Sequence, residues 1–341
     1  MDLPDLEAEA REKIDATFYD YIAGGAEDEG TLAENETSWS RWRLRPKVLR
    51  DVRTIDTSTT LLGETVSSPV AIAPMAMQHK ASEAGPVATA RAAAEAKALF
   101  CMGLFGAGSA GNVAAVANGT PQWLQVYVMA DRERSVEAIA RSAEQGYKAV
   151  VITVDVARQG NRRRDARNRW SFQQSDGQVE DPNELFDHAL TFSDIAWFVE
   201  RSPIPIVVKG VMRGDDARAC IDSGASGVVV SNHGGRQLDG AEATSDALPE
   251  VVDAVAGRGE VYVDGGIRRG QHVVKALALG AQAVFVGRPF MWGLVVADQK
   301  GVEGVLHGFQ DEVERAMALC GVRSIGEIDR SLVISGSLSG R

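Results

Sequence analysis

Residues 228–240 read VVVSNHGGRQLDG, an apolar run that changes abruptly into polar residues and glycines. Three β-branched residues in a row predict a buried strand that ends near Ser231. The pair Gly234-Gly235 then allows a tight turn or the close approach of a ligand. His233 and Arg236 flank these glycines, and titratable groups on a loop at a strand end are typical of functional sites. The alternative is structural, with His233 capping the strand and Arg236 in a surface ion pair.

Apolar runs of the same kind recur from residue 70 onward and alternate with helical stretches. The predicted strands are Val70–Met75, Leu99–Met102, Trp123–Val128, Ala149–Val154, Pro205–Val208, Gly227–Val230, Val261–Val263 and Ala283–Val286. The predicted helices between them are Ala84–Lys97, Arg132–Gln145, Asp215–Ser223, Ala247–Ala256 and Gly270–Leu279. Strands that are apolar nearly throughout predict a parallel sheet buried on both faces. Eight such repeats favour an α/β fold of the (β/α)8 TIM-barrel type over an open sheet, and no GxGxxG follows the first strand.

The barrel is expected to have extensions at both ends of the chain. Residues 1–66 predict an N-terminal helical segment packed on the barrel, with helices at Asp5–Ala23 and Glu29–Ser38. The barrel itself is assigned to residues 67–330, and its last helix is placed at Glu303–Cys320. Residues 331–341 are expected to form a disordered tail.

The charge composition of the chain argues against two classes of binding partner. The 341 residues carry a formal net charge of −11, which argues against nucleic acid and against an anionic membrane surface as partners. Residues 98–130 hold no charged side chain, but glycines and polar residues divide this stretch into strands and a short helix, so no membrane span is predicted.

Cysteine usage and the N-terminus indicate the compartment. Cys101, Cys220 and Cys320 lie far apart in apolar surroundings, which predicts buried thiols rather than disulfides or a metal site. The first 15 residues are acidic and amphipathic, unlike a signal peptide. We therefore expect a cytoplasmic protein.

The ends of the last two strands suggest a phosphate site. Asp264, Gly266 and Arg268 follow one strand, and Gly287 and Arg288 follow the other. Glycines let backbone N–H groups approach an anion, arginines supply charge, and phosphate sites in barrels recur in these two loops. Glycine turns with surface arginines are the alternative reading.

Two other basic features require an explanation. Lys209 closes the apolar strand PIVVKG, so its ammonium is expected at the barrel mouth, where an anion, a Schiff base or a negatively charged cofactor would suit it. Residues 157–169 read ARQGNRRRDARNR, and most of these arginines are expected at the solvated surface. One arginine turned inward would bind a substrate carboxylate in bidentate fashion.

Several motifs in the sequence resemble those of a known enzyme family. The motifs SNHGGRQLDG, DGGIRRG followed by KALALGA, VGRP, APMAMQ, YDYIAGGAED and QVYV, together with TVD ahead of the arginine-rich stretch, resemble the FMN-dependent L-2-hydroxy acid oxidases and dehydrogenases. That family includes glycolate oxidase, lactate oxidase, hydroxymandelate oxidase and the flavin domain of flavocytochrome b2. The likeness runs from about residue 5 to about residue 330, and the first two motifs are the specific ones.

The resemblance implies an (S)-2-hydroxy-acid oxidase or dehydrogenase that uses FMN. A small L-2-hydroxy acid would be oxidised to the 2-oxo acid, with His233 as the base, flavin N5 as the hydride acceptor and O2 or another acceptor reoxidising the flavin. A homotetramer or larger assembly is also implied. Two alternatives stay open: an FMN barrel that oxidises a larger biosynthetic intermediate, and a catalytically inactive flavin-binding barrel.

The resemblance also implies roles for individual residues. Besides His233, the catalytic group would include Tyr127 near the substrate hydroxyl and Lys209 near flavin N1. Arg162 and Arg236 would hold the substrate carboxylate, with Tyr21 assisting. The implied FMN contacts are Pro74, Met75, Ala76, Gln125, Thr153, Lys209, Ser231, Asp264, Gly266, Arg268, Gly287 and Arg288.

The sequence departs from the family pattern at the substrate pocket. Residues 102–105 read MGLF where the family commonly has a serine-rich stretch, and Phe105 is expected to line the pocket. Gln159 occupies a position that is often aliphatic, so the pocket wall is expected to be more polar than usual. These differences leave the identity of the hydroxy acid open.

Overall fold

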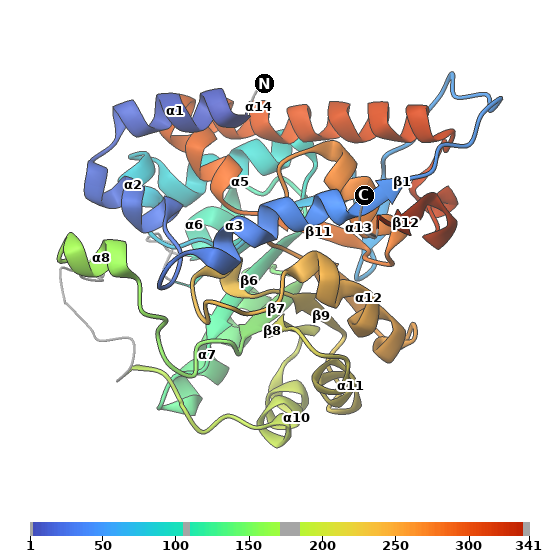
Figure 1. Cartoon of the computed structure of the whole chain (residues 1–341). Coiled ribbons are helices and arrows are strands. Elements are labelled where there is room, and N and C mark those ends of the chain that lie inside the picture. Colours follow the sequence, from blue (N-terminus) through green and yellow to red (C-terminus); the bar gives the residue numbers. More distant parts are fainter. Residues whose placement is uncertain (1–2, 105–109, 171–184, 337–341) are drawn as a thin grey trace.

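Eight parallel strands close into a barrel in this computed structural model, which describes residues 3–104, 110–170 and 185–336 (Figure 1). The barrel strands are β4 (Val70–Ile72), β5 (Phe100–Gly103), β6 (Gln122–Tyr127), β7 (Ala149–Thr153), β8 (Ile206–Val211), β9 (Gly227–Val230), β10 (Glu260–Val263) and β11 (Ala283–Val286). They pair in sequence order, and β11 closes the ring on β4. The predicted (β/α)8 barrel is confirmed.

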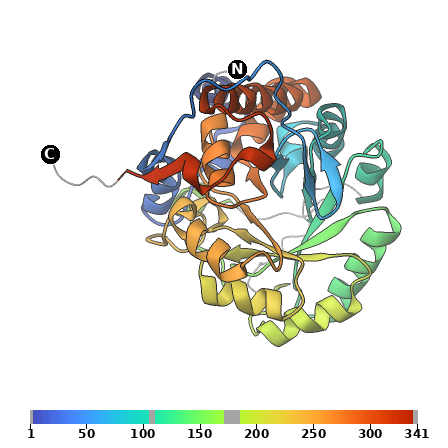
Figure 2. The ribbon, with the colours of Figure 1, turned by 90° about the vertical axis from the view of Figure 1, so that its right-hand side faces the viewer.

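Helices surround the strands, as Figure 2 shows. Their bounds are α4 (Gln78–Ala81), α5 (Gly85–Ala96), α6 (Ala110–Ala115), α7 (Arg132–Glu144), α8 (Arg163–Arg167), α10 (Phe192–Arg201), α11 (Gly214–Asp222), α12 (Thr244–Val255), α13 (Gly270–Ala278) and α14 (Arg288–Cys320). The strands are buried on both faces because side chains pack against helices outside and against one another inside the barrel.

One end of the barrel is closed by a hairpin. Strands β2 (Thr59–Leu61) and β3 (Glu64–Val66) pair antiparallel. Their buried side chains Leu61 and Val66 belong to the same apolar cluster as Trp123 inside the barrel. Because this plug fills the N-terminal end of the strands, the opposite end is left for a pocket, as barrels of this class require.

The N-terminal segment differs from the prediction of one helix over Asp5–Ala23. The structure has α1 (Leu3–Lys13) and α2 (Ala16–Ala23), because the carboxylate of Asp15 accepts from the N–H groups of Thr17 and Phe18 and starts a new helix. Helix α1 lies along α14 (Figure 1). Helix α3 (Gly30–Thr37) and the 3-10 turn η1 (Ser38–Arg41) follow.

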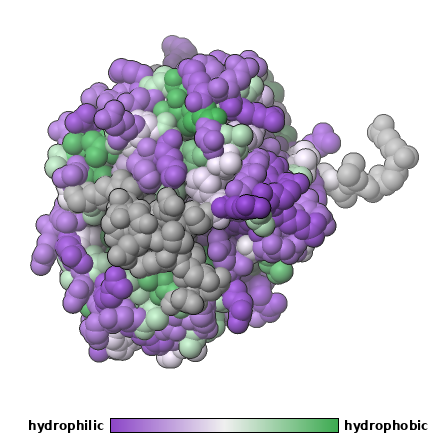
Figure 3. All heavy atoms as spheres, turned by 90° about the vertical axis from the view of Figure 1, so that its left-hand side faces the viewer, coloured by the Kyte–Doolittle hydropathy of each residue, from purple (hydrophilic) through white to green (hydrophobic). Residues whose placement is uncertain are grey.

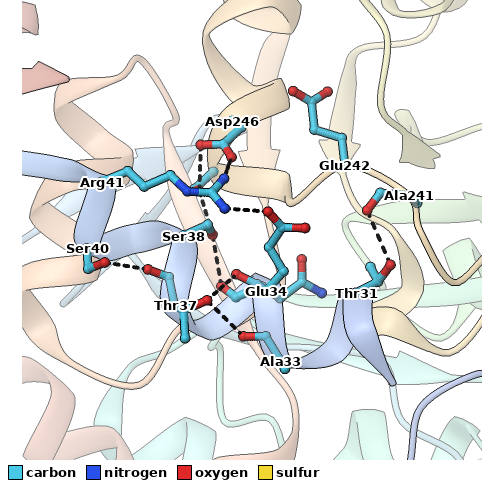
Figure 4. A network of polar contacts seen from close by, with 12 residues as sticks. Thr31, Ala33, Glu34, Thr37, Ser38, Ser40, Arg41, Ala241, Glu242 and Asp246 are labelled. Atoms are coloured by element: carbon cyan, nitrogen blue, oxygen red, sulfur yellow. Dashed lines mark hydrogen bonds and ion pairs between the residues drawn. The ribbon is translucent and has the colours of Figure 1, made fainter. Parts of the chain in front are cut away.

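Figure 4 shows how α3 and η1 are attached to the barrel. The guanidinium of Arg41 pairs with Glu34 of α3 and with Asp246 of α12, and the hydroxyl of Thr31 donates to the carbonyl of Ala241 at 3.2 Å. The Arg41 pairs are solvent-accessible and contribute little stability. A buried amide pair, Asn35 with Asn232, is the stronger anchor, since each side chain donates to the other at 2.8 Å.

Two predictions about the C-terminal part differ from the structure in detail. Helix α14 begins at Arg288 and its backbone is non-helical at Ala297 and Asp298, so the predicted helix Glu303–Cys320 lies in the part of α14 after this kink and ends at the predicted residue. The prediction that residues 331–341 are disordered is wrong for residues 333–335, because β12 (Val333–Ser335) pairs antiparallel with β1 (Trp42–Leu44). Three short 3-10 turns, η2 (His233–Gly235), η3 (Ile325–Glu327) and η4 (Arg330–Leu332), complete the described elements.

The surface fits the charged composition. Hydrophilic side chains predominate on the face shown in Figure 3, with small hydrophobic patches between them. Within the described ranges, no helix has the length and apolar character needed to cross a membrane. Cys101, Cys220 and Cys320 are free and buried, as predicted.

Candidate active site

A pocket opens where the barrel strands end. Most of the residues singled out from the sequence line it, although they lie far apart along the chain: Tyr21, Pro74, Met75, Ala76, Gln125, Tyr127, Gln159, Arg162, Lys209, His233, Arg236, Asp264, Gly266, Arg268, Gly287 and Arg288. Thr153 and Ser231 are buried and are not among the described lining residues. Phe105 lies outside the described residues.

An imidazole–carboxylate pair lies at the pocket wall, which His233 lines. Nδ1 of His233 lies 2.9 Å from Oδ1 of Asp155, which lies in the loop after β7. Close packing makes this possible: a Cβ on Gly210 of β8 would lie 2.6 Å from Cβ of Asp155, and Gly210 has a φ of +107°. His233 itself adopts a left-handed φ of +59°. Such a conformation costs energy in a non-glycine residue and is concentrated at functional sites.

Burial and charge set the protonation states of this pair. Burial lowers the pKa of His233 below its ordinary value, against the opposing effect of Asp155. Burial alone would raise the pKa of Asp155, but the neighbouring His233 and Lys209 outweigh burial and lower it. The favoured state near neutral pH is therefore a neutral imidazole beside a carboxylate, which is the starting state that a general base needs.

Lys209 lies beside the base in a second polar cluster. Its Nζ donates to Oγ of Ser231 at 2.9 Å and lies 3.4 Å from Oδ2 of Asp264, while the Ser231 hydroxyl donates to the same Asp264 oxygen at 2.9 Å. The Lys209 and Asp264 side chains are only 7% and 11% exposed. Burial alone would lower the pKa of Lys209, but the two carboxylates Asp264 and Asp155 outweigh burial and raise it, so the ammonium stays charged.

Two arginines form a cationic wall next to His233. The guanidinium of Arg236 donates to the carbonyl of Gly24 at 2.9 Å and lies over the Tyr21 ring, 4.8 Å from its centroid. Burial, with a further contribution from Arg162, lowers the pKa of Arg236 to about 10. Arg162 donates to the carbonyl of Arg236 at 3.3 Å. Two adjacent guanidinium groups suit a carboxylate ligand, which would relieve their mutual repulsion.

The structure separates Arg162 from its neighbours in the basic run. Arg163 pairs with Glu27 and Asp28, and Arg164 pairs with Asp20 and Glu29, all in the N-terminal segment. These arginines fasten α8 to the N-terminal segment, whereas Arg162 lines the pocket. The sequence-based choice of Arg162 is consistent with this placement.

Arg288 and Arg268 lie at another part of the pocket wall. The guanidinium of Arg288 is held by carbonyl oxygens, at 2.9 Å from Ile22 and 2.9 Å from Gly24, and burial lowers its pKa to about 9. Arg268 pairs with Glu36 at 2.5 Å. Gly266, in the loop between β10 and α13, has a φ of +69°, and a Cβ there would lie 1.9 Å from the carbonyl oxygen of Asn35, so only glycine fits.

Sequence reasoning missed part of the wall. Phe186 and Leu185 line the pocket, and the Phe186 ring stacks on Tyr127 with centroids 4.6 Å apart. Burial raises the pKa of Tyr127 to about 12, so its hydroxyl stays protonated. Trp170 stacks on Tyr21 at 4.9 Å. No motif in the sequence marked these aromatic residues.

Fold and site together define a class of protein: a (β/α)8-barrel enzyme whose pocket holds a buried imidazole–carboxylate pair and several buried cations, suited to an anionic substrate and a phosphate-bearing cofactor. The chain belongs to the FMN-dependent dehydrogenase family, whose family model matches residues 10–335.

Named relatives cover nearly the whole chain. It is 41% identical to 2-hydroxyacid oxidase 1 of Mus musculus, over 99% of this chain and 97% of the relative. It is 42% identical to glycolate oxidase of Spinacia oleracea, over 96% and 94%. A solved structure of mandelate oxidase matches with a TM-score of 0.90 at 39% identity, over 95% of this chain and 96% of the other.

The cofactor of this family is FMN, and the pocket fits it. Two buried polar atoms of pocket-lining residues, Nε2 of Gln125 and Oδ1 of Asp264, have no hydrogen-bond partner among the described residues. Unpaired buried polar atoms are costly and call for a ligand or water. A flavin offers hydrogen-bonding groups on both its ring and its ribityl chain, and its phosphate matches the charge of Arg288.

Proposed function

We propose that this enzyme oxidises a small L-2-hydroxy acid to the corresponding 2-oxo acid, with His233 as the base. FMN-dependent oxidation of 2-hydroxy acids is the activity of the family's relatives, the 2-hydroxyacid, glycolate and mandelate oxidases. The observation that carries the proposal is the His233–Asp155 pair at 2.9 Å beside the two guanidinium groups of Arg162 and Arg236. This arrangement supports the proposal of a proton acceptor next to a carboxylate-binding site.

Each part of the pocket has a distinct task in the proposal. Arg162 and Arg236 bind the substrate carboxylate and thereby orient the α-carbon and its hydroxyl. His233 accepts a proton as two electrons leave the substrate, and Asp155 stabilises the imidazolium that forms. The hydroxyl of Tyr127, which stays protonated, and the hydroxyl of Tyr21 are further hydrogen-bonding groups on the same wall.

The remaining residues would hold the cofactor. Arg288, Arg268 and the glycine backbone at Gly266 and Gly287 would bind the phosphate. Gln125 and Asp264 would satisfy their unpaired atoms on the ring and the ribityl chain. When bound, FMN supplies a ring that accepts two electrons and is then reoxidised by O2 or another acceptor.

Lys209 has an electrostatic task that follows from its burial. Its ammonium stays charged in the pocket wall, so it favours any state of the site in which negative charge develops nearby. A fixed cation of this kind costs no reorganisation during the reaction, because Ser231 and Asp264 already hold it in place.

An anaerobic spectral titration tests the proposal. The purified yellow protein is mixed with glycolate, L-lactate or L-mandelate, and the D-enantiomers of the last two serve as controls. At least one L-acid should bleach the flavin absorbance, the D-acids should leave it unchanged, and air should restore it. A protein that stays yellow with every 2-hydroxy acid would contradict the proposed function, and colour that returns only with an artificial acceptor would exclude O2.

A further inference from the structure

The side chain of Gln237 joins the two loops that carry the proposed machinery. Its Nε2 donates to the carbonyl oxygen of Asp155 at 2.8 Å and to that of Arg158 at 2.9 Å. Its Oε1 accepts from the N–H of Gly160 at 3.2 Å and from the guanidinium of Arg162 at 3.3 Å. One amide therefore makes four hydrogen bonds, and all four reach the loop that follows β7.

The backbones of the two loops are also in direct contact. A Cβ on Gly160 would lie 2.4 Å from the carbonyl oxygen of Arg236 and 2.6 Å from that of Gln237, so only glycine permits this approach. Nε of Arg162 donates to the same Arg236 carbonyl at 3.3 Å. The relative position of the loops is thus fixed by main-chain packing and by one side-chain amide.

This contact joins residues that must act together. Asp155 and Arg162 lie on the loop after β7, whereas His233 and Arg236 lie on the segment after β9. The base and its carboxylate partner therefore lie on different loops, and so do the two arginines. A shift between the loops would alter both pairs at once, and misplacement by about 1 Å can cost roughly 100-fold in rate.

We propose that Gln237 is a positioning residue. It holds the His233–Asp155 pair and the carboxylate clamp, formed by Arg162 and Arg236, in the correct position relative to each other. The inference rests on the proposed function. Gln237 is absent from the described lining of the pocket, so it acts through Asp155 and Arg162 rather than on the substrate. Its amide is suited to this task because it has two donors and two acceptor sites, and the loop uses both kinds.

The principal test is Gln237→Met, which removes the four hydrogen bonds at nearly constant volume. In the FMN-saturated enzyme, we expect KM for the best 2-hydroxy acid to rise about tenfold and kcat per bound flavin to fall about tenfold. The acid limb of the pH profile of kcat/KM should move to lower pH, because a displaced Asp155 no longer raises the pKa of His233. A residue with a merely structural role would not move this limb.

A matched control is Gln310→Met. Nε2 of Gln310 donates to Oγ1 of Thr57 at 3.4 Å, and neither residue belongs to the described pocket wall. This variant should retain the parent's kinetics and pH profile. If Gln237→Met fails to fold, Gln237→Glu replaces it: the carboxylate keeps the two accepted bonds but has no donor for the carbonyls of Asp155 and Arg158, so kcat should still fall about tenfold.

Hydrogen exchange tests the proposal without a measurement of turnover. Peptides that cover residues 156–162 should exchange faster in Gln237→Met than in the parent or in Gln310→Met. Unchanged exchange together with kcat and KM within twofold of the parent would overturn the proposal. If the parent's flavin is not bleached by any 2-hydroxy acid, the proposed function fails, and the exchange comparison still decides whether Gln237 holds the loop.

Discussion

His233 and Asp155 are joined through Nδ1 of the imidazole and one carboxylate oxygen, 2.9 Å apart. Because a carboxylate can only accept, Nδ1 carries the hydrogen of the neutral ring and Nε2 keeps its lone pair. The pair therefore selects the tautomer in which the nitrogen that is not held by Asp155 can take a proton. The strained φ of +59° at His233 is consistent with a side chain whose direction is set by function.

Replacing the proposed base should abolish most of the reaction and leave binding intact. His233→Asn removes the proton acceptor, so the rate of anaerobic flavin reduction should fall by about 10³-fold or more. FMN and the product 2-oxo acid should still bind, because the phosphate and carboxylate contacts are unchanged. Stopped-flow absorbance measures the reduction rate. A rate within a few-fold of the parent would rule out His233 as the base.

Removing the carboxylate partner should change the pH profile in a defined direction. Asp155 raises the pKa of His233, against burial and the charge of Lys209, so Asp155→Asn should lower that pKa. Because kcat/KM depends on the neutral base, its acid limb should move to lower pH. kcat should fall by about 10²-fold or more, since the imidazolium loses its counter-charge and the tautomer is no longer fixed. An acid limb that stays in place or moves to higher pH would contradict this role.

Much of the barrel could be predicted because its strands are short apolar runs with sharp ends. β9 and β11 lie at the predicted residues, since β-branched runs bounded by polar loops leave little choice. The predicted elements were wrong where a single side chain or a tertiary contact determines the secondary structure. Asp15 divides a helix that periodicity alone would continue, and β12 forms only because β1 is there to pair with it.

The site residues also differ in how far the sequence alone can predict them. Motifs singled out His233, Arg236 and the proposed phosphate loops, because glycines and charges at strand ends are visible in the sequence. Which arginine of the basic run faces inward depends on the acidic residues of a distant segment that pair with Arg163 and Arg164. Phe186 joins the wall through a stack on Tyr127, a contact that no spacing along the chain reveals.

Lys209→Met tests the electrostatic task of the buried ammonium. A cation near the flavin favours the reduced, negatively charged ring over the oxidised one, so its loss should lower the midpoint potential of the bound flavin and slow its reduction. The substitution also leaves the buried Asp264 without its ion pair, so a loss of stability is expected as well. The potential is therefore measured by spectroelectrochemistry on the fraction that retains FMN. An unchanged potential would reduce Lys209 to a structural residue.

His272 should make stability depend on pH below neutrality. Its Nδ1 accepts from the N–H of Arg268 at 3.3 Å, its ring stacks on Trp39, and burial lowers its pKa from 6.5 to about 4. A depressed folded-state pKa gives stability that is complete above the unfolded value and is lost as the pH falls from 6.5 towards 4. With allowance for partial exposure, the loss by about pH 5 is roughly 1–2 kcal/mol.

Urea unfolding at about pH 7.5 and pH 5 checks this expectation on the FMN-saturated protein. His272→Asn keeps an acceptor for the Arg268 N–H but does not titrate in this range. The parent should lose more unfolding free energy than the variant between the two pH values. Equal losses would show that His272 does not contribute.

The carboxylate clamp can be tested against its own neighbours in the chain. Arg162 lines the pocket, whereas Arg163 pairs with Glu27 and Asp28 at the surface. Arg162→Lys and Arg236→Lys should each raise KM and lower kcat, because lysine cannot hold a carboxylate in bidentate fashion and the α-carbon loses its orientation. The expected cost in kcat/KM is about 2–4 kcal/mol. Arg163→Lys keeps its surface charge and should change kcat/KM by less than about twofold. Steady-state kinetics with the best hydroxy acid compares the three variants, and a sensitive Arg163 beside an insensitive Arg162 would show that a different arginine of the run binds the substrate.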